Sequence, residues 1–155
     1  MSLRTFLHAA VAVAFLLGLS AGAGAARAET ATVLTTLTAK KAEAMFRDLG
    51  YTSIEVDKDN DLVVTIQGMK VLVLVGSTGG SSMQMRFAVA DTKATMARVN
   101  TWNKTKMYSR AYLDDDGDPV LEAEQDLVGG VTEERLKDFI KTFGVSLSAF
   151  LNEVT

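Results

Sequence analysis

The sequence predicts an α+β fold, in which an antiparallel sheet of five to six strands is packed against helices. Short segments alternate apolar and polar residues and are bounded by Gly and Asp turns, which is typical of strands. Three other segments carry apolar residues at helical spacing. The predicted order is α-β-β-β-β-α-β-β-α. Most consecutive strands are joined by tight turns, which link antiparallel strands. A chain of 155 residues suits a single folded unit, expected over residues 37–155.

Residues 1–28 resemble a secretory signal peptide. Arg4 supplies the positive start, 6–19 is an apolar run, and an Ala-Arg-Ala sequence precedes the predicted cleavage between Ala28 and Glu29. The alternative is an uncleaved anchor, because about 20 uncharged residues can cross a bilayer. Either way, the folded part is expected to be periplasmic or secreted, with no membrane association after cleavage.

Composition limits the chemistry of the mature chain. The only histidine, His8, lies in the signal segment, and cysteine is absent. The commonest general base, the commonest zinc ligands and the thiol nucleophile are therefore missing. Loss of Arg4 and Arg27 leaves 14 basic against 19 acidic residues, a net charge of −5. The sequence has no basic stripe of the kind that nucleic-acid-binding proteins carry, so nucleic acid is not an expected partner. The sequence predicts neither catalytic residues nor a cofactor.

The first helix is expected over Leu37–Leu49, where apolar residues recur at helical spacing, and Gly50 is a suitable C-cap residue. The preceding residues, 29–36, carry little pattern and are predicted to be a loose leader. A second helix is expected from an Asp91 N-cap to about Asn103, with Trp102 as a packed anchor. The last helix begins after a Thr132 cap and carries a long apolar stripe.

The first four strands are expected over 52–57, 62–67, 70–75 and 82–90. A two-residue loop of Gly68-Met69 in a type II′ turn would pair Ile66 with Val71. Both faces of that hairpin are mostly apolar, so cover on both sides is expected. Because one small domain has few helices, a second copy of the chain in a homodimer is an alternative source of cover.

The register of the last hairpin follows from its two faces. A three-residue loop of residues 115–117 places Ala111 opposite Leu121 and Arg110 opposite Glu122, whereas a loop of even length would mix the faces. Gly117 supplies the left-handed residue that such a loop requires. One face then belongs to the core. The other face is the candidate partner surface and carries Tyr108, Arg110, Tyr112, Glu122 and Glu124.

Two features suggest alternative chemistry. Asp57, Asp59 and Asp61 have the spacing of a calcium loop, and a second aspartate group follows from Asp114, but neither has the Gly and Glu that an EF-hand loop requires. Turn chemistry is the competing interpretation. Glu122 and Glu124 lie on one strand face and could form the carboxylate pair of a hydrolase. An open strand face, however, excludes little water.

Four short motifs from Asn100 onward resemble the YbjN domain family, a family described as bacterial sensory transduction regulators. They are Asn100-x-Trp102-Asn103, Arg110-Ala-Tyr-Leu-Asp114, Asp116-Gly-Asp-Pro-Val120 and Gly129-Gly130-Val131-Thr132. The resemblance covers residues 37–152 and implies a fold like that of type III secretion chaperones. It implies no catalytic residue. The positions that it marks as structural are Trp102, Asn103, Asp116, Gly117, Pro119, Gly129 and Gly130.

The sequence as a whole favours an exported, non-enzymatic protein-binding or regulatory module with an unidentified protein partner. Tyr and Arg on one surface are residue types enriched at interfaces. The alternatives are a calcium-responsive module and, with less support, a carboxylate-based hydrolase. A solvated sheet surface is the simplest competing interpretation of the hairpin face.

Overall fold

The structure is a computed structural model that describes residues 31–155. The predicted signal peptide and its cleavage position lie outside these residues. The described elements, in chain order, are β1 (Val33–Leu34), α1 (Ala39–Asp48), β2 (Ile54–Val56), β3 (Leu62–Ile66), β4 (Met69–Leu74), β5 (Ser82–Ala88), α2 (Met96–Thr105), β6 (Arg110–Leu113), β7 (Pro119–Asp126), β8 (Val131–Thr132) and α3 (Glu133–Glu153).

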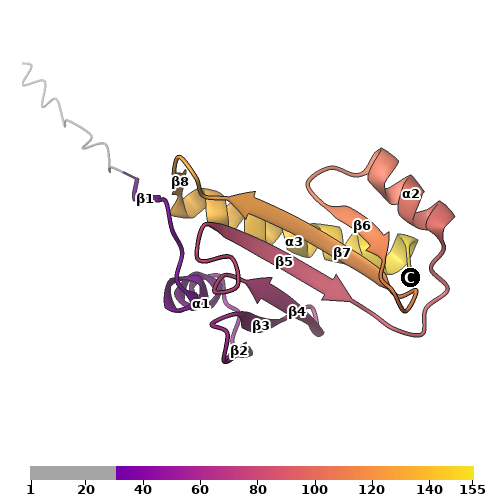
Figure 1. Cartoon of the computed structure of the whole chain (residues 1–155), viewed down its shortest axis with the longest axis horizontal. Coiled ribbons are helices and arrows are strands. Elements are labelled where there is room, and N and C mark those ends of the chain that lie inside the picture. The colour runs from indigo at the N-terminus through magenta and orange to yellow at the C-terminus, as the bar shows by residue number, and fades with distance from the viewer. Residues whose placement is uncertain (1–30) are drawn as a thin grey trace, which may run out of the picture.

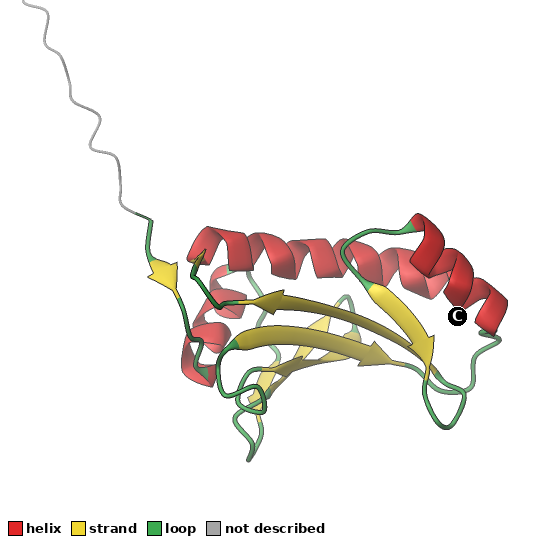
Figure 2. Ribbon diagram, turned by 45° about the horizontal axis from the view of Figure 1, so that its top comes forward, coloured by secondary structure: helices red, strands yellow, loops and turns green. Residues whose placement is uncertain are grey.

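Six strands form one antiparallel sheet in the order β2-β3-β4-β5-β7-β6. The two longest strands, β5 and β7, pair from Ser82 opposite Asp126 to Ala88 opposite Val120 although the intervening chain forms α2 and β6. Helix α3 runs along one face of the sheet, with α1 at one end and α2 at the other (Figures 1 and 2). The predicted α+β class and element order are confirmed.

The core lies between the sheet and the helices. Every second residue of the central strands points into it, as the alternation of β3 and β5 predicts. On the helix side, α1 contributes Met45 and Phe46, while α3 contributes an apolar stripe that ends at Phe150. Trp102 of α2 packs edge-on against Phe150, with ring centroids 5.6 Å apart. This contact confirms the expected anchor role of the tryptophan and fixes α2 onto α3.

The opposite face of the sheet, called here the outer face, carries no helix in the described part of the chain (Figure 2). The sequence predicts cover on both sides of β3 and β4. Their outer residues Val63, Leu72 and Leu74 are instead half-buried. The expected cover from within the chain is therefore not found among residues 31–155.

The β3–β4 hairpin turns one residue earlier than predicted. Ile66 pairs with Met69, and Val64 pairs with Val71, so the loop is Gln67-Gly68. Both loop residues have positive φ, 52° and 81°, as a type I′ turn requires. The predicted pairing is wrong by two residues, which leaves the faces unchanged because side chains alternate with a period of two.

The sequence predicts the ends of α1 and α3 better than the start of α2. Thr38 and Thr132 cap α1 and α3 through their side chains. Helix α2 begins at Met96 with Thr95 as its N-cap, so the predicted Asp91 cap is wrong. Asp91 has a φ of 58°, outside the helical range, and lies in the preceding loop.

Two short strands add to the predicted elements. Val33 pairs with Thr132, and Leu34 with Val131, so β1 and β8 form a separate two-stranded sheet. The sequence predicts a loose leader over residues 29–36, whereas part of that segment is ordered here. Gly129 and Gly130 before β8 both have positive φ, and a Cβ on Gly130 would lie 2.5 Å from Val33. Glycine at 130 thus permits the approach of β1.

The β6–β7 hairpin has the predicted register. Arg110 lies opposite Glu122, and Ala111 lies opposite Leu121. The backbone N–H of Asp114 donates to the carbonyl of Asp118, which closes the expected three-residue loop. Gly117 has a φ of 85°, the left-handed conformation that the loop requires.

Replacement of Gly117 by Ala should destabilise the protein by about 1 kcal/mol, because a Cβ is disfavoured at positive φ even in open space. Gly117→Asn should cost less, since Asn tolerates this conformation better. Urea unfolding measures both values, with the exposed neighbour substitution Asp116→Ala as control. Equal stability of the Ala and Asn variants would contradict the left-handed assignment.

Candidate functional site

The outer face has a charged cluster on the half of the sheet that is formed by strands β5, β7 and β6. The register places Arg86, Glu122 and Arg110 side by side in one row across these strands. Gln84 and Tyr112 lie one pleat away on the same face, because residues i and i+2 of a strand point the same way. These five side chains, called here the outer-face cluster, are brought together by long-range pairing.

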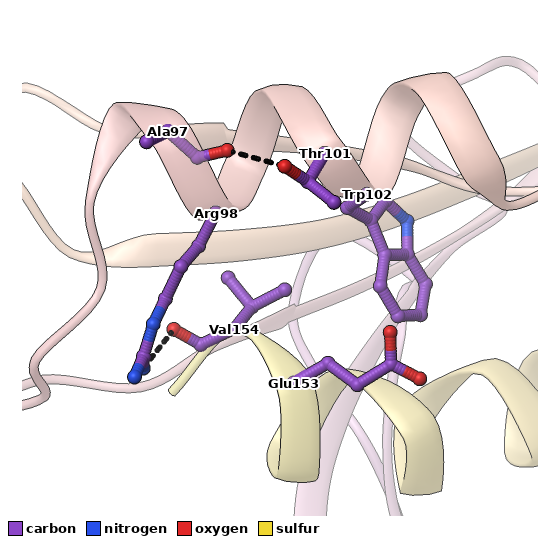
Figure 3. Close-up of a pocket in the computed structure, with 6 residues that line it drawn as sticks. All are labelled: Ala97, Arg98, Thr101, Trp102, Glu153 and Val154. Carbon is purple, nitrogen blue, oxygen red and sulfur yellow. Dashed lines mark hydrogen bonds between the residues drawn. The ribbon is translucent and has the colours of Figure 1, made fainter.

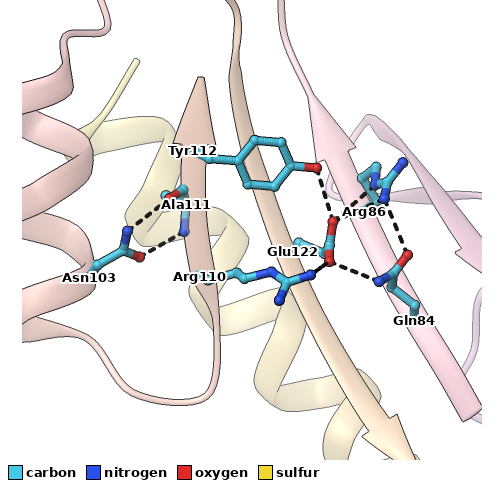
Figure 4. A network of polar contacts seen from close by, with 7 residues as sticks. All are labelled: Gln84, Arg86, Asn103, Arg110, Ala111, Tyr112 and Glu122. Atoms are coloured by element: carbon cyan, nitrogen blue, oxygen red, sulfur yellow. Dashed lines mark hydrogen bonds and ion pairs between the residues drawn. The ribbon is translucent and has the colours of Figure 1, made fainter. Parts of the chain in front are cut away.

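Glu122 is the hub of the cluster (Figure 4). One carboxylate oxygen forms an ion pair with Arg110 and accepts a hydrogen bond from Gln84 at 2.8 Å. The other oxygen accepts from Arg86 at 3.1 Å and from the Tyr112 hydroxyl at 3.0 Å. Both oxygens thus have two donors each, which satisfies this buried acid.

The cluster buries its acid and exposes its bases. The side chain of Glu122 is 1% exposed, whereas those of Arg86 and Arg110 are 40% and 65% exposed. Burial alone would raise the pKa of Glu122. Hydrogen bonds from Arg110 and Tyr112, with the charges of both arginines, outweigh it and lower that pKa. Burial and the bond to Glu122 raise the pKa of the Tyr112 hydroxyl.

This electrostatic arrangement opposes acid–base catalysis by the two glutamates. A general acid at neutral pH needs a raised pKa, whereas the pKa of Glu122 is lowered. Glu124 lies exposed on the same face and makes no ion pair among the described residues. The geometry therefore gives no support to the carboxylate-hydrolase alternative. What the cluster provides is a set of Arg and Tyr side chains held in fixed positions.

The five residues of the predicted partner surface fall into two groups. Arg110, Tyr112 and Glu122 belong to the outer-face cluster, although Glu122 is covered by its neighbours and offers no surface of its own. Tyr108 and Glu124 lie outside the cluster and are exposed, Tyr108 to 69%. Tyr108 also has a φ of 67°, an uncommon conformation for a bulky residue.

Asn103 connects α2 to the outer edge of β6. Its side-chain amide donates to the carbonyl of Ala111 and accepts from the Ala111 N–H, both at 2.8 Å (Figure 4). These are the hydrogen bonds that a neighbouring strand would otherwise make. Asn103 therefore protects the outer edge of β6 at Ala111. The two bonds need both a donor and an acceptor, which gives a physical reason for the amide at this position of the motif.

The aspartate turns are built as hydrogen-bonded loops. Asp57 accepts from the N–H groups of residues 59 and 61, and Asp114 accepts from those of residues 116 and 118. Asp61 is buried and is bonded to Ser77 and to the Val75 N–H. Burial would raise its pKa, but these bonds outweigh it and lower the pKa. Within residues 31–155, no group of three acidic or histidine side chains is placed to hold a metal ion.

A small hollow of about 210 Å³ separates α2 from the end of α3 (Figure 3). Arg98 crosses it and donates to the backbone carbonyl of Thr155 at 2.8 Å. The guanidinium thus binds backbone carbonyls just after α3, as a cation at a helix C-terminus does. The hydrogen bond of Arg98 across this hollow therefore has a structural role, because it holds the two helices together.

Sequence reasoning missed Gln84 and Arg86 as members of the site. Their alternation with Met83 and Met85 places them on the outer face, and this was visible in the sequence. Their proximity to Glu122 was not, because it depends on the pairing of β5 with β7 rather than with β6.

The sequence profile of the YbjN family matches residues 39–155. This family is described as "Putative bacterial sensory transduction regulator". The chain belongs to the YbjN family. Its conformation is similar to that of YbjN from E. coli, which is described as "a putative transcription regulator", with a TM-score of 0.58 at 17% identity. The match covers 72% of this chain and 85% of that chain.

A Yersinia pestis type III secretion chaperone, SycH, solved in complex with a stable fragment of YscM2, matches with a TM-score of 0.48 at 16% identity, covering 68% of this chain and 94% of that one. None of the curated proteins matches the chain. Within the described part of this YbjN-family domain, no helix is long and apolar enough to cross a membrane.

Replacement of Glu122 by Gln should lower the free energy of unfolding at pH 7 by about 1–3 kcal/mol, because two arginines lose their shared counter-charge. The pKa of Glu122 is lowered in the folded state. Its stabilisation is therefore full above the ordinary glutamate pKa of about 4.3 and is lost as pH falls below it. The gap between wild type and variant should accordingly shrink in acid.

Urea unfolding at pH 7 and at pH 3 measures this gap. Glu124→Gln is the matched control, since it removes an exposed glutamate from the same strand face and should change stability by no more than about 0.5 kcal/mol. A Glu122→Gln effect that stays constant across pH would show that the carboxylate charge is not what stabilises the cluster.

Replacement of Asn103 by Ala should cost about 1–2 kcal/mol, because the backbone of Ala111 loses two hydrogen bonds at once. Asn103→Asp should also destabilise, since a carboxylate cannot donate to the Ala111 carbonyl. Amide hydrogen exchange at Ala111 should accelerate in both variants. Lys104→Ala, on the exposed side of α2, is the control and should leave this amide unchanged.

Proposed function

We propose that this YbjN-family chain is an exported, non-enzymatic module that binds a protein partner and acts in regulation. The observation that carries this proposal is the outer face of the sheet, where arginine and tyrosine side chains are fixed by one buried carboxylate. Arg and Tyr dominate binding energy at many interfaces. Side chains that are already held in place lose little entropy on binding, which favours affinity.

The family description as a sensory transduction regulator supports the regulatory part of the proposal. Export is proposed from the sequence of residues 1–28 alone. It places the partner in the periplasm or outside the cell, rather than among cytoplasmic regulators. Mass spectrometry of the native protein tests it: a mature N-terminus at Glu29 is expected, whereas a chain that retains Met1 in the cytoplasm would contradict it.

Arg110→Gln should weaken partner binding by about tenfold, the loss typical of an interface arginine. Its guanidinium is 65% exposed and accessible to a partner. Arg86, Gln84 and Tyr112 still hold Glu122 in this variant, so the fold should persist. The measurement is crosslinking of the tagged full chain in its native compartment, followed by quantification of the enriched partner.

Lys70→Gln provides the matched control. Lys70 is exposed on the same face of the sheet, away from the cluster, and its replacement changes the net charge equally. Equal loss of partner in both variants would show that binding depends on net charge alone, and it would contradict a specific binding surface at Arg110. Recovery of the chain alone would contradict a separate partner and indicate a homodimer, for which the half-buried apolar residues of β3 and β4 provide a surface.

A further inference from the structure

Strand β7 is longer than its neighbour β6, which leaves part of the β7 edge on that side unpaired. The β6 pairing begins at Pro119 and ends at Glu122, whereas β7 continues to Asp126. In the described part of the chain, no strand pairs with residues 123–126 on the side of β6 (Figure 1). An unpaired edge of this kind is a template on which another strand can form.

The hydrogen-bonding direction of this edge follows from its neighbours. The Leu127 N–H donates to Ser81 next to β5, and the Asp118 carbonyl accepts from Asp114 on the β6 side. In an antiparallel sheet, successive residues direct their backbone groups to opposite sides. Even-numbered residues of β7 therefore direct theirs toward β6. Beyond Glu122, the next such residue is Glu124, and its N–H and C=O face the unpaired side.

Tyr108 explains why β6 stops short. If β6 continued, Tyr108 would lie opposite Glu124 and pair with it. Its φ of 67° instead turns the backbone away from β7. A non-glycine residue in this conformation costs of the order of 1 kcal/mol, and such strain is frequent at binding sites. The unpaired edge at Glu124 is therefore a direct consequence of the conformation of Tyr108.

A groove runs beside this edge, between β7 and α3. It consists of two hollows of about 310 and 330 Å³ that share Tyr108 and Thr142. Three large apolar side chains line it and are strongly exposed: Met107 to 70%, Tyr108 to 69% and Val145 to 72%. Exposed apolar side chains gathered in one place are typical of interaction sites. The unpaired β7 edge and the groove together are called here the edge groove.

The charge of the edge groove is mostly negative. Glu124 and Asp138 line it, and Asp126 lies at the end of the edge. The two cations among its lining residues are both already paired, Arg135 with Asp138 at 2.9 Å and Lys106 with Glu153 at 2.5 Å. A second copy of the chain fits poorly here, because pairing of two identical β7 edges would bring Glu124 and Asp126 close to their own copies. A basic partner meets no such repulsion.

We propose that the edge groove binds an extended peptide segment in which apolar residues alternate with lysine or arginine, and that this segment adds to β7 as an extra strand. The proposal rests on the proposed protein-binding function and specifies its mode. Backbone hydrogen bonds to Glu124 would give affinity. Apolar side chains would enter the groove against Val145 and Met107, and basic ones would face Glu124 and Asp126.

The experiment titrates the full chain with a blocked eight-residue peptide of alternating lysine and valine. Fluorescence of Trp102, the only tryptophan, reports binding because this residue lines the groove. NMR hydrogen exchange of the Glu124 amide reports strand addition. A peptide with four lysines followed by four valines has the same composition without the alternation, and a glutamate–valine peptide reverses the charge.

The alternating lysine peptide should bind best and should slow exchange of the Glu124 amide. Glu124→Pro removes the N–H donor at an edge position, where proline is tolerated, and should weaken binding by about tenfold or more. Glu124→Gln keeps the backbone and should lose only about two- to threefold, the effect of one exposed charge. A lysine–valine probe with N-methylated amides should bind poorly to the unaltered protein, which tests the same bonds without a variant.

Equal binding of the alternating and block peptides, or of the N-methylated probe, would overturn the proposal. So would unchanged exchange at Glu124 under saturating peptide. Because these measurements use defined peptides, they are independent of the crosslinking experiment. A native partner that depends on Arg110 but not on Glu124 would preserve the binding function and reject the edge groove as its site.

Discussion

The burial of Glu122 on an uncovered sheet face is the constraint on which the outer surface depends. An unpaired carboxylate at 1% exposure would carry a large desolvation cost. Four donors from the two neighbouring strands, β5 and β6, remove that cost, and in return Glu122 fixes the positions of two arginines and a tyrosine. The same contacts hold β5, β7 and β6 in register from outside, while the core holds them from inside. The contacts that fix the surface side chains therefore also stabilise the pairing of these three strands.

The two edges near β6 are treated in opposite ways. Asn103 completes the backbone hydrogen bonds of Ala111, so the outer edge of β6 is protected there. A few residues away, Tyr108 turns the chain aside and leaves the edge of β7 unpaired. Edge protection is general in natural sheets, so an edge left open beside an exposed apolar groove is notable. This contrast, more than any single side chain, supports recognition of an extended partner segment.

Local patterns in the sequence predict much of the fold. Alternation, helical spacing and turn residues are short-range signals, and they identify the last hairpin, its three-residue loop and the faces of each strand. The errors also have local causes. Gln67 occupies a left-handed position usually held by Asn or Gly, so the Gln67-Gly68 turn was assigned one residue late. Asp91 resembles a helix cap, but Thr95 provides the cap next to the apolar residues of α2.

The site was less predictable, because its contacts are long-range. The hairpin register brings Arg110 to Glu122, and this pair follows from the sequence. Arg86 reaches the same carboxylate through a strand pairing that spans 36 residues, which no local pattern encodes. The open β7 edge depends on the backbone conformation of Tyr108, and nothing in its residue type signals a positive φ.

The most direct test is a ¹³C NMR titration of the side-chain carboxyl of Glu122 in the folded protein. Burial by itself raises a carboxyl pKa, whereas ion pairing and hydrogen bonding lower it, so the direction of the shift distinguishes the two. We predict a pKa below the ordinary glutamate range, accompanied by a raised pKa for the Tyr112 hydroxyl. A normal or raised pKa at Glu122 would mean that the arginines do not hold it, and the fixed outer face would then be contradicted.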